Sequence, residues 1–175
     1  MQYIHDGITE KSHEKSKILD KITKSSFNVT ILSREIALHP TEERPMFQWK
    51  IAYTKFGKLI DLIEVVRQEE ASKMKSLVYS YNKLFDLYAR LIKTINIVQV
   101  AKNKDTYVTK IELLNNRIFM ETLSIASITS KLIEKNNLEQ EDKLRELRVV
   151  WTILILFMTL FIFIFSFYIS KDITE

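Results

Sequence analysis

Apolar residues recur at steps of three and four along four successive stretches of the chain. This spacing places them on one face of a helix and predicts four amphipathic helices that pack by their apolar faces. The longest unbroken set is Met74, Leu77, Tyr81, Leu84, Tyr88, Leu91, Ile95 and Val98. The other sets are Ile18, Ile22, Ser25, Val29, Leu32 and Ile36; Trp49, Tyr53, Phe56, Ile60 and Ile63; and Ile111, Leu114, Ile118, Glu121, Ile125, Ile128 and Leu132.

A different pattern fills the last part of the chain, where Val149–Ser170 form a run of 22 residues without a charge. As a helix, this run is about 33 Å long, enough to cross the roughly 30 Å hydrocarbon core of a bilayer. A buried soluble helix is the alternative, but the preceding residues could hardly cover an all-apolar helix on every side. Trp151 and Tyr168 lie near its ends, where we expect their rings at the two membrane interfaces.

The breaks between the stretches are short. His39 precedes Pro40 and is therefore disfavoured in a helix, so the first helix should end there. The second break is weakly marked near Gln68–Ser72, and the polar segment Lys102–Asp105 makes the third. No breaker separates Leu132 from the apolar run, so the fourth helix and the span should form one continuous rod, or two rods joined at Asn136 and Asn137.

Four long helices with short connections predict an all-α fold: an antiparallel up-down-up-down four-helix bundle with a C-terminal transmembrane helix. The expected parts are an N-terminal tail (1–8), the bundle (9–148), the span (149–170) and the start of a linker (171–175). In this topology the beginning of the first helix lies at the same end as the finish of the fourth. Residue 1 should therefore sit next to the membrane.

Composition supports long helices and narrows the partners. The chain has only two glycines, two prolines and no cysteine, which leaves few turns and excludes disulfides and thiolate metal sites. The net charge of +4 is modest and the basic residues are scattered, so nucleic acid is not an expected partner. The lipid bilayer is the expected partner.

The sequence carries no catalytic motif, so we do not expect an enzyme, a cofactor or a metal site. The three histidines lack a zinc-ligand spacing, and no glycine-rich loop could bind a nucleotide. The segment around Arg44, Gln48 and Trp49, with His39 before it, could form one wall of a pocket for a small ligand, since it combines a cation, an amide and an indole. The alternative, which we favour, is that Trp49 is simply the first core residue of its stretch.

A polar row runs beside the fourth apolar stretch, because Asn115, Thr122 and Thr129 recur every seven residues. Such a row could form the seam of a homodimer, with one flank of the helix in its own bundle and the other against a second copy. The alternative is that the row faces solvent.

The residues Ile31-Leu32-Ser33-Arg34-Glu35-Ile36-Ala37-Leu38-His39-Pro40-Thr41-Glu42-Glu43-Arg44-Pro45-Met46-Phe47-Gln48-Trp49-Lys50, followed by Gly57-Lys58-Leu59-Ile60, resemble the extracytoplasmic sensor regions of bacterial and archaeal membrane histidine kinases. In those regions a helix ends in an "hPsEra..QW" turn and the next helix carries "lGkLl". The resemblance covers roughly residues 10–170, and Ser170–Thr174 is similar to the entry of a HAMP linker. It implies a dimer, a first span before the bundle and HAMP, PAS and kinase modules after it. The chain would then be a sensor module from a longer protein.

Two functions remain open. The resemblance implies a sensory module of a two-component signal transduction protein, with the bundle outside the cell membrane and a stimulus passing through the fourth helix and the span. The charges favour a cytosolic bundle, because Lys143, Arg145 and Arg148 precede the span and only Lys171 follows it. The alternative is therefore a tail-anchored cytosolic interaction protein with a layout similar to that of SNARE proteins. We follow the resemblance.

Overall fold

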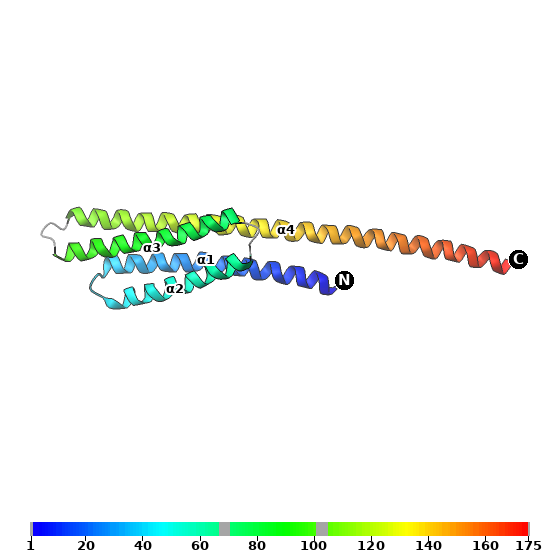
Figure 1. The fold of residues 1–175 in the computed structure, drawn as a ribbon, viewed down its shortest axis with the longest axis horizontal. Coiled ribbons are helices and arrows are strands. Elements are labelled where there is room, and N and C mark those ends of the chain that lie inside the picture. Colours follow the sequence, from blue (N-terminus) through cyan, green and yellow to red (C-terminus); the bar gives the residue numbers. More distant parts are fainter. Residues whose placement is uncertain (1, 67–70, 101–104, 175) are drawn as a thin grey trace.

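The computed structural model describes residues 2–66, 71–100 and 105–174, and these residues are helical apart from the turn at 39–42. The helices are α1 (Gln2–Leu38), α2 (Glu43–Val66), α3 (Ala71–Val100) and α4 (Asp105–Thr174). Strands are absent from these ranges, and the all-α prediction is confirmed. Figure 1 shows α1, α2, α3 and the first half of α4 lying along one another, while the second half of α4 extends far beyond them. We call the packed part, up to Arg148, the helical body.

The end of α1 agrees with the predicted break at His39, but its start does not agree with the predicted tail. The predicted tail is wrong, because α1 begins at Gln2 and continues through Gly7, whose single glycine penalty does not stop a long helix. At the other end of α1, the His39 amide donates to the Glu35 carbonyl at 2.8 Å, and Pro40 prevents continuation. The other two breaks were predicted at 68–72 and 102–105, and of these residues 68–70 and 102–104 lie outside the described residues. Ala71, Ser72 and Asp105 are helical.

The fourth helix and the apolar run form one rod. α4 has 70 residues and passes through Asn136 and Asn137 without a break, so the alternative of two jointed rods is wrong. Both asparagines are tolerated because a helix of this length depends on packing more than on the propensity of single residues.

The predicted apolar stretches form the core. Trp49, Phe56, Leu84, Ile118 and Ile125 are each exposed by 1 % or less. Ser25, Tyr53, Tyr81, Ile111 and Ile128 are only half-buried, and Val98 has no described side chain. Beside the first stretch, Ser26 is fully buried and donates to the Thr23 carbonyl at 2.8 Å.

Aromatic rings fill the space between α2 and α3. Trp49 stacks on Tyr88 with ring centroids 3.5 Å apart, and Tyr53 stacks on Tyr81 at 4.5 Å. Because whole rings separate the two helices, their backbones approach each other less closely than those of α1 and α4 or α3 and α4. A Cβ on Gly57 would lie 2.6 Å from the Tyr81 hydroxyl oxygen, so this glycine makes room for a ring rather than for a second backbone.

The distal half of α4 is the one candidate membrane span among the described residues. It contains an 18-residue window with a mean hydropathy of 2.7, none of which is buried. The large apolar side chains from Val149 to Phe167 are exposed, which water would disfavour strongly. The hydroxyls of Thr152 and Thr159 each donate to the carbonyl four residues earlier at 2.8 Å, so their polarity is satisfied without solvent.

Candidate functional site: a polar ladder and groove between α1 and α4

Paired polar side chains join α1 to α4 through the interior of the helical body. The Thr23 and Thr129 hydroxyl oxygens are 2.6 Å apart, and the Thr30 hydroxyl bonds with that of Thr122. Closer to the apolar run, the Asn136 side-chain amide donates to the Ser12 carbonyl at 2.8 Å and reaches the hydroxyls of Ser12 and Ser16 at 2.9 Å each. We call these three contacts the polar ladder. They show that α1 and α4 run in opposite directions.

The ladder has a strict register. Each step of seven residues along α4, from Asn136 to Thr129 to Thr122, is matched by a step of seven along α1, from Ser16 to Thr23 to Thr30. Seven residues are close to two helical turns, so each step returns to the same face of both helices. Sequence reasoning found the row on α4 but not its complement on α1, although the spacing of Ser16, Thr23 and Thr30 was visible in the sequence.

This register corrects the predicted dimer seam. Thr122 and Thr129 are fully buried, and their hydroxyls contact α1 of the same chain. In this structure they therefore lie against α1 of their own chain rather than on an outer face, and they do not face solvent. Their polarity has an internal reason, because each hydroxyl meets a hydroxyl on the neighbouring helix. The third member of the row, Asn115, is only half-buried.

The next step of the register has no polar pair. Seven residues from Thr122 lies Asn115, and seven residues from Thr30 lies Ala37, whose methyl group offers no hydrogen-bond partner. Among the described residues, Asn115 has no hydrogen bond. At this point a groove opens between α1 and α4, with a volume of about 750 Å³. We call it the α1–α4 groove.

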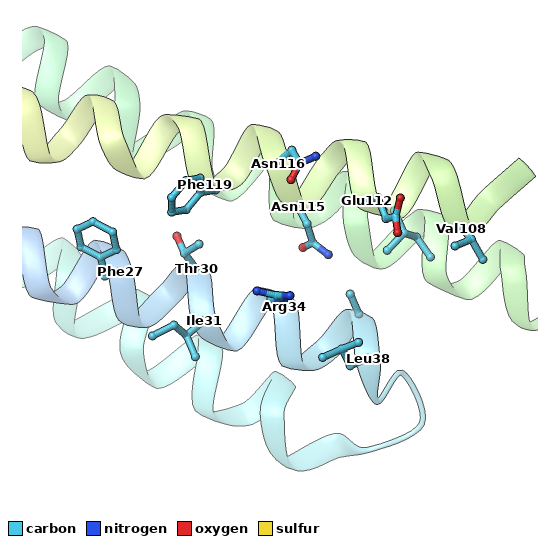
Figure 2. Close-up of a pocket in the computed structure, with 12 residues that line it drawn as sticks. Phe27, Thr30, Ile31, Arg34, Leu38, Val108, Glu112, Asn115, Asn116 and Phe119 are labelled. Atoms are coloured by element: carbon cyan, nitrogen blue, oxygen red, sulfur yellow. The ribbon is translucent and has the colours of Figure 1, made fainter.

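The groove combines an apolar lining with a few polar groups. Its apolar side chains include Phe27, Ile31, Leu38, Val108 and Phe119, and its polar side chains are Thr30, Arg34, Glu112, Asn115 and Asn116. In Figure 2 the Arg34 guanidinium and the Asn115 amide point toward each other across the space between the helices, and Phe119 points toward Thr30. Apolar walls with a small number of converging polar groups are typical of small-molecule sites.

The charges in the groove are not neutralised by the protein. Neither Arg34 nor Glu112 has an ion pair or hydrogen bond within the part of the chain that the structure describes. By contrast, Lys83 on α3 contacts Glu121 on α4 at 2.6 Å, and this carboxylate is largely buried. The hydrogen bond to Glu121 raises the pKa of the Lys83 ammonium above its ordinary value. On the α3–α4 side, where Lys83 and Glu121 line a second, more open hollow, the two charges neutralise each other, whereas the α1–α4 side keeps two charged groups available.

The residues predicted to bind a ligand differ in their surroundings. Trp49 lies in the core, where its indole N–H donates to the Ser33 hydroxyl at 2.9 Å. His39 and Arg44 are exposed, with His39 3.6 Å from Glu42, and Gln48 is half-buried. The pocket interpretation of this segment is therefore wrong for Trp49, and the alternative of a core residue holds. None of the four lines the α1–α4 groove.

The predicted membrane-interface residues lie at the ends of the apolar run. Trp151 is half-buried at the start of this run, while the side chain of Tyr168 lies outside the described ones. No group of three His, Asp or Glu side chains gathers as a metal site within the described ranges. Comparison of the chain with models of protein families, with curated proteins and with solved structures found no match.

Proposed function

We propose that the chain is the signal-input module of a membrane-bound two-component signal transduction protein. In this proposal the helices form an up-down-up-down four-helix bundle, anchored by one span, and α4 carries a stimulus from the bundle into the bilayer. The observation that carries the proposal is the continuity of α4. One helix supplies a face of the polar ladder, a wall of the groove and the apolar run.

The register of the ladder supports a start of α1 near the beginning of the apolar run. Ser16 lies opposite Asn136, so Gln2 comes level with Val150, where the apolar run begins. Figure 1 also shows the start of α1 beside the middle of α4. A preceding span could therefore join α1 directly, as the resemblance to sensor histidine kinases implies.

The threonine pairs suit an interface that shifts. Each threonine hydroxyl also lies within hydrogen-bond distance of the carbonyl four residues earlier on its own helix, at 3.0 to 3.2 Å. When a pair separates, both hydroxyls can donate to these carbonyls, so no buried donor is left unsatisfied. Small discrete shifts of packed helices, of about 1–2 Å, then cost little polar free energy.

Asn136 suits the opposite role of a fixed point. Its buried amide reaches three acceptors on α1, and losing them would leave buried N–H groups unsatisfied. α4 can therefore tilt about Asn136. The distance from Asn136 is about 30 Å to Asn115 and about 50 Å to Ser170, so a displacement at the groove is passed to the far end of the span with the opposite sense.

A crosslinking experiment tests this proposal. The chain has no cysteine, so Thr30→Cys with Thr122→Cys provides a single disulfide across the ladder. In a chimera whose α4 continues in register into the HAMP and kinase modules of a membrane histidine kinase, oxidation should change autophosphorylation several-fold, and reductant should reverse the change. The two single-cysteine variants are the controls. Equal output of the oxidised and reduced double variant would exclude transmission through the α1–α4 interface.

The tail-anchored alternative is favoured by one observation, the cations Lys143, Arg145 and Arg148 before the apolar run. Thiol labelling in intact cells separates the two. With the chain expressed behind an N-terminal span, cysteines at the exposed positions Glu10 and Ser72 should react with an impermeant reagent from outside. Reaction only after lysis would support the cytosolic alternative. Ser12 is unsuited to this test, because it is buried against Asn136.

A further inference from the structure

We propose that the α1–α4 groove binds a small zwitterion with an apolar body, of the class of apolar and aromatic amino acids. As the stimulus of the input module, this ligand rests on the function proposed above. Its binding, however, depends only on the groove and can be measured separately.

The charges of the groove select a zwitterion over a simple ion. Arg34 on α1 and Glu112 on α4 are the charged side chains of the lining, one of each sign. The guanidinium can hold a carboxylate by two parallel hydrogen bonds, and the Glu112 carboxylate can accept from an ammonium group. A plain anion bound to Arg34 would leave Glu112 without a partner and beside a second negative charge. A plain amine bound to Glu112 would leave Arg34 without a partner and beside a second positive charge. A ligand that carries both a carboxylate and an ammonium group pairs with Arg34 and Glu112 at the same time.

The amide of Asn115 fits between these two charges. It faces Arg34 across the groove (Figure 2) and has no hydrogen-bond partner among the described residues. In the register, Ala37 lies opposite Asn115, whereas a hydroxyl lies opposite Thr122 and Thr129. An amide can donate to a carboxylate and accept from an ammonium at the same time. The ligand would thus supply the polar group that the protein omits at this step of the ladder.

The apolar lining indicates the chemistry of the uncharged part of the ligand. Phe27, Ile31 and Phe119 lie along the groove toward the middle of the body, beyond Arg34. A volume of about 750 Å³ falls within the range of about 300–1,000 Å³ of small-molecule pockets. The groove can therefore accept an aromatic side chain beside the charged end. Because the ligand would touch both helices, it would favour one position of α4 over another, which is what coupling to a shift requires.

Three probes with the same ring test the assignment. L-phenylalanine carries both charges, 3-phenylpropanoate lacks the ammonium and 2-phenylethylamine lacks the carboxylate. Binding of each to the full chain in lipid nanodiscs is measured by isothermal titration calorimetry, with empty nanodiscs as the baseline. Because a hydrogen bond to a charged group contributes about 1.5–3 kcal/mol, phenylalanine should bind about ten- to a hundredfold more tightly than either analogue.

Two variants assign the two charges. Arg34→Gln should weaken phenylalanine and phenylpropanoate at least about tenfold, and it should not weaken phenylethylamine, because it removes a like charge. Glu112→Gln should weaken phenylalanine and phenylethylamine and should not weaken phenylpropanoate, for the same reason. The matched controls Glu35→Gln and Lys110→Gln alter exposed charges outside the lining and should bind as the unaltered chain does. Circular dichroism checks that all four variants keep the fold.

Several results would overturn the assignment. It fails if no probe binds saturably at about 10 mM, a concentration that detects even millimolar sites. It also fails if phenylpropanoate or phenylethylamine binds as tightly as phenylalanine, or if both lining variants bind as the controls do. If phenylalanine binds as expected but leaves the kinase chimera unchanged, the binding site stands and its sensory role fails. If the disulfide alters the chimera but phenylalanine does not bind, only this ligand class is lost.

Discussion

Replacing Asn136 by alanine should destabilise the helical body far more than the same change at its neighbour Asn137. The Asn136 side chain is 4 % exposed and its amide reaches three acceptors on α1, whereas Asn137 is exposed. The two substitutions are chemically identical and occur one residue apart in the same helix. Their difference therefore isolates the contact with α1.

The magnitude follows from the contacts. Removing the Asn136 amide leaves the buried acceptors on α1 without their donor, which costs about 1–3 kcal/mol, and the cavity adds to this cost. Alanine gains about 0.6 kcal/mol of helix propensity over asparagine at either position. The net loss at Asn136 is about 2 kcal/mol, against a slight gain at Asn137. For a domain of this size, 2 kcal/mol lowers the melting temperature by about 4–8 °C.

Thermal unfolding in mild detergent, followed by circular dichroism, measures both variants under the same conditions. Asn136→Ala should melt several degrees lower and Asn137→Ala at or slightly above the unaltered chain. Equal melting temperatures would refute the fixed-point role of Asn136, and with it the tilt proposed for α4.

Three further tests probe the core and the α2–α3 and α3–α4 contacts. Leu84→Ala should cost about 2–5 kcal/mol in thermal or denaturant unfolding, because this side chain is 1 % exposed; an unchanged melting temperature would contradict the predicted core. Gly57→Ala should stabilise the fold by less than the roughly 1 kcal/mol that alanine gains over glycine in a helix, since the new Cβ would meet the Tyr81 hydroxyl at 2.6 Å, and Gly57→Ala should be more favourable in a Tyr81→Phe background; additive effects would exclude that contact. The pKa of Lys83 is raised above 10.5 by its hydrogen bond to Glu121, so the pair stabilises the fold below pH 10.5 and this contribution is lost as the pH rises through the raised pKa. Between pH 10 and 12 the unaltered chain should therefore lose more stability than Glu121→Gln, and identical pH profiles would argue against the ion pair.

The site was harder to predict than the helices, for a physical reason. Periodicity shows which face of a helix is buried, but not which neighbour covers it. The row of Asn115, Thr122 and Thr129 was recognised as unusual, yet its partners on α1 are about a hundred residues away in the chain. Arg34 and Glu112 gave no local signal, because single charges on helix surfaces are ordinary. Pairing the polar sets of α1 and α4 in an antiparallel register would have found the ladder and its open step.

The sequence by itself determined the all-α class, the apolar stretches that form the core and the apolar run at the end of α4. These depend on local spacing, on proline and on the absence of charge, which act within one helix. Only the tertiary structure decided that Trp49 is a core residue, that Thr122 and Thr129 face α1, and that the groove opens beside Ala37. Those outcomes depend on the register between two helices, and a register is set by the packing of side chains that are distant in sequence.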